Sequence, residues 1–328
     1  MSVASRQIHL VARPEGMPKA SDFAVVGFEC PDAGEGQVQV QNLLMSVDPY
    51  MRPRLTNDQP LNAPMLGGGL GRVMQSNNAK FKEGDLVRHG AGMQDIFVSD
   101  GRGMAVLHPD PELPLSVYMH ALGGTGITAY GGLLDVGKLQ DGEQVFVSTA
   151  GGAVGSVVAQ IAKIKGCYVV GSTGSDEKAA WLKDVVGLDA VINYKTQPII
   201  PALGAVTPKG VDVYFENVGG AHLDAALSRM NLKGRIAVCG MISTYNGGGD
   251  PVSRLSNMIY SRVTMQGFVA SDFPHLDEAF RSDMTRWLKS GEVKYQETIL
   301  DGFDRAPEGL IGLFKGDNAG KMLIRVAT

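Results

Sequence analysis

The fold is decided by the stretch Ala150-Gly151-Gly152-Ala153-Val154-Gly155. It follows the apolar run Val145-Phe146-Val147, precedes a helical pattern over Ser156 to Lys165, and leads to a second apolar run, Tyr168-Val169-Val170. This order of strand, tight turn, helix and strand is typical of a dinucleotide site, because small residues let backbone approach a pyrophosphate and the helix N-terminus offers N–H groups to it. A glycine turn that serves only packing is the alternative.

The residues after the second apolar run indicate which nicotinamide cofactor fits. An NAD site has Asp or Glu roughly 20 residues after the turn, on the ribose 2′-hydroxyl. This chain has Gly171-Ser172-Thr173-Gly174-Ser175 there, which leaves room for a 2′-phosphate, and Lys178 can give that phosphate a charge-assisted hydrogen bond. Asp176 and Glu177 suit the start of a helix through its dipole. NADP is therefore the predicted cofactor, with an ordinary solvated lysine as the alternative for Lys178.

Length and composition predict two domains and a small-molecule partner. The chain has 328 residues, 44% of them hydrophobic, with 30 basic and 34 acidic side chains. This balance provides no basic field for nucleic acid. No apolar run approaches the roughly 20 residues that span a bilayer, and no signal pattern is seen, so we expect a cytoplasmic protein without a membrane partner. The scattered cysteines Cys30, Cys167 and Cys239 are predicted to be free thiols.

Two patterns divide the chain. Short apolar runs separated by Gly, Pro and Asp over roughly residues 6 to 110 predict an antiparallel β lobe. From about Tyr118, strands alternate with segments of helical period, which predicts a parallel, doubly wound sheet. The later strands are expected at Ala190–Ile192, Val211–Phe215, Arg235–Cys239, Val263–Val269 and Met322–Val326.

The C-terminal part carries one further helical pattern. A helix over Leu276 to Ser290, with Phe280, Met284 and Leu288 on one face, is expected to close the parallel layer. The tail after it is expected to consist of glycine turns and a short final strand that rejoins the β lobe. The glycine-rich loop at Asn246–Asp250 is predicted to be mobile.

A β lobe before a dinucleotide-binding domain, with the tail returning to the lobe, resembles the medium-chain dehydrogenase/reductase superfamily. Many members bind zinc through a cysteine in the lobe, a Gly-His-Glu and a further ligand. The matching segments here, Ser46–Arg52 and Leu66–Val73, contain no cysteine and no His-Glu pair, and no metal is therefore expected. The ungrouped histidines are predicted to be surface or loop residues, namely His9, His89, His108, His120, His222 and His275.

Eight short motifs follow one another in order along almost the whole chain. They are Asp48-Pro49-Tyr50-Met51-Arg52, Gly126-Ile127-Thr128-Ala129-Tyr130, Ala153-Val154-Gly155, Gly174-Ser175-Asp176-Glu177-Lys178, Asn193-Tyr194-Lys195, Glu216-Asn217-Val218-Gly219-Gly220, Ile242-Ser243-Thr244-Tyr245-Asn246 and Gly316-Asp317-Asn318-Ala319-Gly320-Lys321. With them the chain resembles the zinc-free leukotriene B4 dehydrogenase/prostaglandin reductase family, which includes curcumin reductase and alkenal double-bond reductases.

The resemblance implies an α/β fold with two domains. A Rossmann doubly wound parallel sheet over residues 121–290 would bind NADP, and a mainly antiparallel, GroES-like catalytic domain over residues 1–120 and 291–328 would bind substrate. The implied reaction is NADPH-dependent reduction of a carbon–carbon double bond conjugated to a carbonyl, on a small-molecule unsaturated ketone or aldehyde. The family also implies a cytoplasmic homodimer, for which we expect a contact through edge strands near Val263 to Val269.

The family's cofactor contacts carry over onto matching positions. Gly152-Ala153-Val154-Gly155 would hold the pyrophosphate, Lys178 the 2′-phosphate, and Tyr194 would add its hydroxyl to that phosphate. Asn217, at the end of a parallel strand, would bond the ribose or phosphate. Packing between strands is the alternative for Tyr194, and a turn role is the alternative for Asn217. The contacts along the nicotinamide would be Cys239, Gly240, Met241, Ile242, Ser243, Thr244, Tyr245, Phe268, Val269, Ala270 and Asn318, with strand core as the alternative for Phe268 to Ala270.

The chemistry of this family needs a hydrogen-bond donor. Hydride transfer to the β-carbon of an enone leaves negative charge on the carbonyl oxygen, and one well-placed donor there is typically worth about 3 kcal/mol. Tyr50, from the β lobe, and Tyr260, from the cofactor domain, are the candidates, because a phenol is neutral near pH 7 and donates a strong hydrogen bond. The alternatives are that Tyr50 packs beneath the Pro49 turn and that Tyr260 covers a helix face.

Two other functions remain open at this point. A zinc-free NADPH quinone oxidoreductase would share the fold and cofactor, although the Asp48–Arg52 and Ser243–Asn246 motifs argue against it. A non-enzymatic NADPH-binding protein would keep the sheet but lack the donors. The presence of both Tyr50 and Tyr260 argues weakly against that reading.

Overall fold

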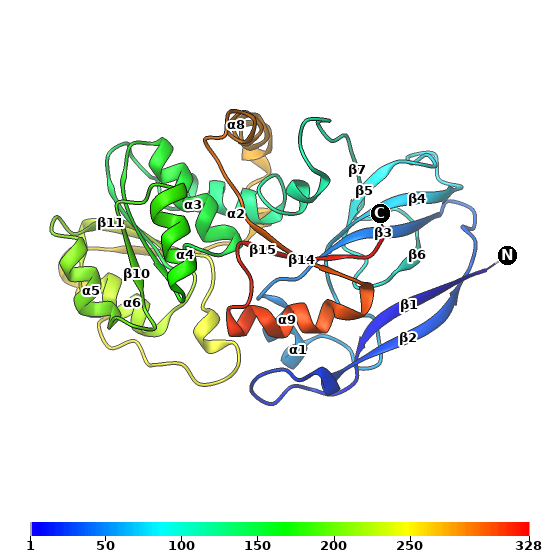
Figure 1. Ribbon diagram of the computed structural model, residues 1–328, viewed down its shortest axis with the longest axis horizontal. Coiled ribbons are helices and arrows are strands. Elements are labelled where there is room, and N and C mark those ends of the chain that lie inside the picture. Colours follow the sequence, from blue (N-terminus) through cyan, green and yellow to red (C-terminus); the bar gives the residue numbers. More distant parts are fainter. Residues whose placement is uncertain (1, 328) are drawn as a thin grey trace. The chain divides into compact units, whose positions relative to one another are not determined.

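The computed structural model describes residues 2–327, which form two compact units (Figure 1). The unit that we call the β unit comprises the residues up to Met119, Glu297–Asn318 and the residues from Met322 on. The second, which we call the α/β unit, comprises His120–Gln296 and Ala319–Lys321.

The β unit is built on antiparallel strands, as its alternating apolar runs predict. Strand β15 pairs antiparallel with β3, with Leu323 opposite Ser46, so the C-terminal tail completes this sheet and its predicted return to the lobe is confirmed. The sheet order is β14-β15-β3-β4-β5-β7, with β6 also paired to β3, and β1 and β2 form a separate pair. The strands are β1 (Val3–Leu10), β2 (Phe23–Cys30), β3 (Val38–Ser46), β4 (Gly69–Ser76), β5 (Leu86–His89), β6 (Ile96–Ser99), β7 (Ala105–Leu107), β14 (Glu297–Asp301) and β15 (Lys321–Arg325).

A helix that the sequence analysis did not predict lies in the tail. Helix α9 (Ala306–Lys315) has Pro307 in its first turn and ends at Gly316, whose φ is 81°. Its buried Leu310 joins a core with Ile8 and Met45 of the strands. The tail therefore contains the predicted final strand, but the expectation of only glycine turns before that strand was wrong. The other helices of this unit are α1 (Met51–Asn57) and the short 3₁₀ turns η1 (Ala20–Asp22), η2 (Leu115–Met119) and η8 (Phe303–Arg305).

The α/β unit contains the predicted parallel sheet. All six strands are parallel and lie in the order β10-β9-β8-β11-β12-β13. The chain therefore builds outward from β8 to β10 and then crosses to β11 on the other side of β8, which makes the β8–β11 boundary a topological switch point. The strands are β8 (Gln144–Val147), β9 (Tyr168–Thr173), β10 (Ala190–Asn193), β11 (Val211–Glu216), β12 (Met230–Val238) and β13 (Thr264–Gly267).

Helices cover both faces of this sheet (Figure 1). Because side chains alternate along a strand, Phe146 and Tyr214 stack 4.8 Å apart in a core shared with α5 and α6, whereas Val213 and Phe215 point to the other face. The helical elements are α2 (Gly124–Gly131), η3 (Gly132–Val136), α3 (Ala153–Ile164), α4 (Asp176–Ala180), η4 (Trp181–Val185), α5 (Ile199–Val206), α6 (Gly220–Leu227), η5 (Ile242–Thr244), α7 (Asn257–Ser261), η6 (Ala270–Asp272), η7 (Pro274–Leu276) and α8 (Asp277–Ser290).

Two predicted details of the helices are wrong. Helix α3 begins at Ala153, inside the glycine stretch, because Gly152 acts as its N-cap. In α8 the buried face is formed by Phe280, Met284 and Trp287, and Leu288 is only half-buried. Counted from Phe280, the buried positions are i, i+4 and i+7, which places Trp287 on the buried face. Leu288 lies one residue farther around the helix.

The histidine prediction fails where a histidine is buried within a strand or a helix. His89 on β5 and His222 on α6 are buried rather than at the surface or in loops. The ring of His89 lies within 2.8 Å of the Asn42 side-chain oxygen, which satisfies one of its nitrogens inside the β unit. Burial lowers the pKa of each of these histidines to about 4, so both are neutral at pH 7.

Candidate active site

The glycine turn closes over a residue with left-handed backbone. Thr149, the second residue after β8, has a φ of 52°, and its carbonyl accepts a hydrogen bond from the Gly152 N–H at 2.9 Å. A Cβ placed on Gly155 would lie 2.3 Å from that carbonyl oxygen, so only glycine lets α3 approach the turn. No side chain caps the N-terminus of α3. Its first N–H groups, with the positive end of the helix dipole, fit the pyrophosphate of a dinucleotide.

The C-terminal tail supports the same turn from outside. The Gly320 N–H donates to the Gly151 carbonyl at 3.1 Å, and Gly320 forms a parallel bridge with Gly152. Gly320 has a φ of 65°, and a Cβ there would lie 1.8 Å from the Gln296 carbonyl oxygen. The predicted Asn318 immediately precedes this segment in the chain and is half-buried in the β unit. The sequence analysis missed Gly320, because its contact is with a residue far away in sequence.

The residues predicted to bind the 2′-phosphate follow two neighbouring strands: Lys178 lies on α4, after β9, and Tyr194 directly follows β10. The stem of Lys178 packs over Gly151, since a Cβ on that glycine would lie 3.2 Å from the Lys178 Cβ. The Tyr194 hydroxyl lies over Gly174, 2.8 Å from the position of a Cβ there. These two side chains therefore flank the turn between β9 and α4, where the 2′ position of a bound ribose is read.

The acidic residue in this turn is already engaged by the protein. Asp176, the first residue of α4, accepts a hydrogen bond from the Asn193 side-chain amide at 2.7 Å. A carboxylate held in this way serves the start of the helix and the end of β10. It is thus not oriented by the protein as a ribose ligand, which favours NADP over NAD as the cofactor that fits.

Asn217 lies at the switch point. It follows β11 directly, and its side-chain amide donates to the Ser148 carbonyl after β8 at 2.7 Å. The neighbouring Glu216 is fully buried, and one of its carboxyl oxygens accepts hydrogen bonds from the Tyr214 hydroxyl and from the N–H groups of Val218 and Gly219. Burial raises the pKa of Glu216. The sequence analysis did not assign Glu216 a role, although its place before Asn217 at a strand end was the available signal.

The predicted stretch Cys239–Tyr245 runs beside the end of β11. The Cys239 N–H donates to the Glu216 carbonyl at 2.9 Å, and the Ile242 N–H donates to the Asn217 carbonyl at 3.1 Å. The Tyr245 hydroxyl accepts from the Met241 N–H at 3.3 Å, which closes the loop on itself. Burial, with the nearby Glu216, raises the pKa of Cys239 to about 12, so this residue is a thiol and not a nucleophilic thiolate at pH 7.

Phe268–Ala270 follow the carboxyl end of β13. The strand ends at Gly267, two residues before the predicted Val269. The Phe268 ring packs against Phe215 at 5.9 Å and Phe273 at 5.6 Å, so it contributes to the core as the alternative reading expected. The side chain of Val269 is 60% exposed. Every predicted cofactor residue of the α/β unit thus follows the carboxyl end of a parallel strand, which is the edge where such sheets bind ligands.

The two candidate donors lie in different units. Tyr50 precedes α1 in the β unit and is 47% exposed, and burial of its hydroxyl with the nearby Asp48 raises its pKa to about 12. Tyr260 lies on α7 in the α/β unit and is 79% exposed. Tyr260 is therefore open to solvent over most of its surface and Tyr50 over about half, and the phenol of Tyr50 is protonated throughout the physiological range.

Within residues 2–327, no group of three or more His, Cys, Asp or Glu side chains is arranged to hold a metal ion, and the three cysteines are free thiols. Within the same range, no helix combines the length and apolar character needed to cross a bilayer.

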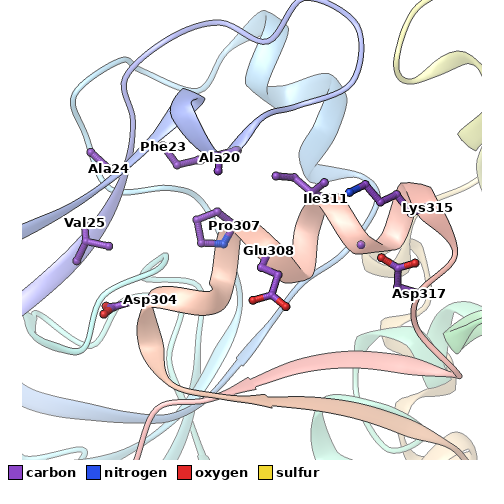
Figure 2. Close-up of a pocket in the computed structure, with 11 residues that line it drawn as sticks. Ala20, Phe23, Ala24, Val25, Asp304, Pro307, Glu308, Ile311, Lys315 and Asp317 are labelled. Atoms are coloured by element: carbon purple, nitrogen blue, oxygen red, sulfur yellow. The ribbon is translucent and has the colours of Figure 1, made fainter.

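A cavity of about 370 Å³ lies in the β unit, and none of the predicted site residues is among those that line it. Figure 2 shows it between α9, which contributes Pro307 and Ile311, and the segment that contains Phe23. Two of its carboxylates already have partners, because Asp304 pairs with Arg6 and Glu308 pairs with Arg305. The cavity is also lined by Lys315 and Asp317, so its wall is apolar in part and charged in part.

A parallel sheet with a glycine turn at its switch point is the arrangement of a dinucleotide-binding unit. Two family models match, "N-terminal domain of oxidoreductase" over residues 6–107 and "Zinc-binding dehydrogenase" over residues 153–290. Three relatives match nearly full length. The NADPH-dependent curcumin reductase of Escherichia coli is 38% identical, over 98% of this chain and 97% of that protein. The 2-alkenal reductase (NADP⁺-dependent) of Nicotiana tabacum is 41% identical, over 99% and 98%. Prostaglandin reductase 1 of Rattus norvegicus is 41% identical, over 95% and 96%.

A solved structure agrees with these relatives. The crystal structure of CurA from Vibrio vulnificus in complex with NADPH superposes with a TM-score of 0.93 at 38% identity, covering 98% of this chain and 99% of that one. The chain therefore belongs to the leukotriene B4 dehydrogenase/prostaglandin reductase family of medium-chain dehydrogenases/reductases. The resemblance expected from the eight sequence motifs is confirmed.

Proposed function

We propose that this protein uses NADPH to reduce the carbon–carbon double bond of α,β-unsaturated ketones or aldehydes. The observation that carries the proposal is the corner formed by Lys178 and Tyr194 beside the glycine turn, in a chain whose relatives are NADPH-dependent curcumin, alkenal and prostaglandin reductases. Lys178 supplies a positive charge and Tyr194 a hydroxyl to the 2′-phosphate. Asp176, which could have favoured a ribose hydroxyl, is held by Asn193.

The protein's own residues bind and orient both reactants. The N–H groups at the start of α3 hold the pyrophosphate, while Asn217 and the stretch Cys239–Tyr245 line the switch point together with Phe268–Ala270. Asn318 completes the nicotinamide pocket in this proposal. When bound, NADPH supplies the hydride that reaches the β-carbon of the substrate.

The donor to the substrate carbonyl is Tyr50 or Tyr260. As the β-carbon is reduced, the carbonyl oxygen gains negative charge, and a phenol O–H placed on that oxygen stabilises it. Tyr50 can donate because its raised pKa keeps the O–H intact at neutral pH. We propose further that residues 1–120 and 291–328 form the substrate-binding domain and residues 121–290 the NADP-binding domain.

The proposal also includes a homodimer in the cytoplasm. Strand β13 is the outer strand of the parallel sheet, and Thr264 and Gln266 on it are exposed, so its free edge can pair with the same strand of a second copy. The free thiols and the NADPH requirement fit a reducing compartment. Light scattering should give twice the mass of one chain, and a stable monomer would contradict this part.

One parallel assay tests the function. NADPH oxidation is followed with a simple unsaturated ketone in the presence of EDTA, beside NADH and beside a quinone. We expect turnover with NADPH and the enone, with the saturated ketone as product. Faster turnover of the quinone would indicate a quinone oxidoreductase, and tight NADPH binding without turnover of any electrophile would indicate a binding protein.

A further inference from the structure

The ring of Tyr194 packs against a buried histidine, His222. The ring of His222 packs edge-to-face against the Tyr194 ring, with centroids 5.0 Å apart and planes at 81°. Tyr194 follows β10, whereas His222 lies in the first turn of α6, after β11. Strands β9 and β8 lie between β10 and β11 in the sheet, so the pair links the loop after β10 to helix α6, which belongs to the other half of the sheet.

The two rings differ in exposure. His222 is only 5% exposed, whereas Tyr194 is 40% exposed, with its hydroxyl over Gly174. Within residues 2–327 the Nε2 atom of His222 is buried without a hydrogen-bond partner. The histidine therefore acts on Tyr194 by ring packing and not through a hydrogen-bond chain.

We propose that His222 is a positioning residue that sets the preference for NADPH over NADH by fixing the ring of Tyr194 at the 2′-phosphate corner. This inference rests on the proposed function, in which the Tyr194 hydroxyl bonds the 2′-phosphate. A tyrosine has two side-chain torsions that must be fixed before its hydroxyl can bond a ligand. Packing by the His222 ring restricts these torsions of Tyr194 before the cofactor binds. NADH has no 2′-phosphate, so its binding does not use that alignment.

The neutral state of His222 suits this role. Burial lowers its pKa to about 4, so the ring carries no charge at pH 7 and adds no Coulomb attraction of its own to a phosphate. An uncharged aromatic ring of similar size should therefore replace it. An edge-to-face pair of this kind typically contributes about two- to tenfold to an equilibrium.

The test measures dissociation constants of NADPH and NADH by cofactor fluorescence for four variants. His222→Ala should weaken NADPH binding by about two- to tenfold and leave NADH binding unchanged, and His222→Phe should keep the wild-type ratio. Tyr194→Phe should lower the ratio by itself, and adding His222→Ala to it should lower the ratio no further. His275→Ala, at an exposed histidine of the same unit, is the matched control.

Each outcome either supports or overturns the proposed role of His222. Equal weakening of both cofactors by His222→Ala would mean a structural role only and overturn the proposal. An unchanged ratio in His222→Ala, with a lowered ratio in Tyr194→Phe, would overturn the role of His222 and leave the proposed function intact. An unchanged ratio in Tyr194→Phe would overturn the proposed role of Tyr194 at the 2′-phosphate and, with it, the role of His222. His222→Leu, which fills the space without an aromatic ring, should weaken NADPH selectively and replaces the alanine variant if that variant does not fold.

Discussion

The side-chain amide of Asn217 donates a hydrogen bond to the backbone carbonyl of Ser148 at 2.7 Å. A second hydrogen bond runs in the same direction, from the Asn217 N–H to the Ser148 hydroxyl oxygen at 2.9 Å. Because Ser148 follows β8 and Asn217 follows β11, this pair fixes the separation of the two strand ends at the switch point. The protein itself therefore fixes the spacing of the strand ends between which the cofactor is proposed to bind.

Replacing Asn217 by Asp should break the hydrogen bond from its side chain to the Ser148 carbonyl. The carboxylate cannot donate, so it would place an acceptor against the Ser148 carbonyl at a half-buried position, which typically costs about 1–3 kcal/mol. NADPH and NADH should both bind roughly five- to 150-fold more weakly, since the defect is not at the 2′ position. Fluorescence titration measures this. Unchanged affinity for both cofactors would show that the pair has no part in shaping the site.

Replacing Lys178 by Met separates its charge from its packing. The methionine keeps an unbranched stem over Gly151 but removes the ammonium group. A charge-assisted hydrogen bond contributes about 1.5–3 kcal/mol, so the dissociation constant of NADPH should rise by roughly 10- to 150-fold while that of NADH stays the same. Lys209→Met, at an exposed lysine of the same unit, is the control. An unaltered preference for NADPH would exclude Lys178 as the selecting residue.

The tyrosine donor can be identified by single replacements with Phe. If Tyr50 or Tyr260 stabilises the developing charge on the carbonyl, its Phe variant should lose about 10²- to 10³-fold in kcat. The dissociation constant of NADPH should not change, because the phenol acts on the substrate. Steady-state kinetics and cofactor titration are measured together. Wild-type kcat in both variants would assign the donor role elsewhere.

Acid should destabilise the protein between pH 6.5 and 4 through its buried histidines. His89 has a folded-state pKa of about 4 against an unfolded value near 6.5, so the unfolded chain binds more protons in this window. Its contribution to stability is complete above pH 6.5, falls as the pH drops to about 4 and levels off below. At about 1.36 kcal/mol per pKa unit, the loss is about 3 kcal/mol.

Urea unfolding of wild type and His89→Gln at pH 7, 5.5 and 4 measures this effect. Glutamine keeps a polar group beside Asn42 but does not titrate, so the variant should lose less stability than wild type between pH 7 and 4. Parallel losses in the two proteins would contradict the assignment.

The sequence predicted those parts of the fold that depend on local pattern. The run Val145–Val147, the glycine turn and the following helix identify the first half of the parallel sheet, because strand and helix periodicities are local properties. Helix α9 was missed since its glycines at 309 and 312 look like turn residues; Gly309 in fact packs its bare backbone against Ile324. Trp287 was missed in favour of Leu288, one position away on the helix.

The rest of the site depends on contacts between distant residues. Neither the Gly320–Gly151 hydrogen bond nor the His222–Tyr194 ring pair has a local signature, because each joins segments that meet only once the sheet is formed. The left-handed backbone of Thr149 was equally unpredictable, since threonine rarely adopts it without surrounding structure.

The position of the transferred hydrogen in the product shows which bond is reduced. The enzyme is supplied with NADPH that carries deuterium in place of both hydrogens at C4 of the nicotinamide and with an unsaturated ketone, and the product is examined by NMR and mass spectrometry. We expect a saturated ketone with one deuterium on the β-carbon. Deuterium on the carbonyl carbon of an unsaturated alcohol, or a product without deuterium, would contradict it.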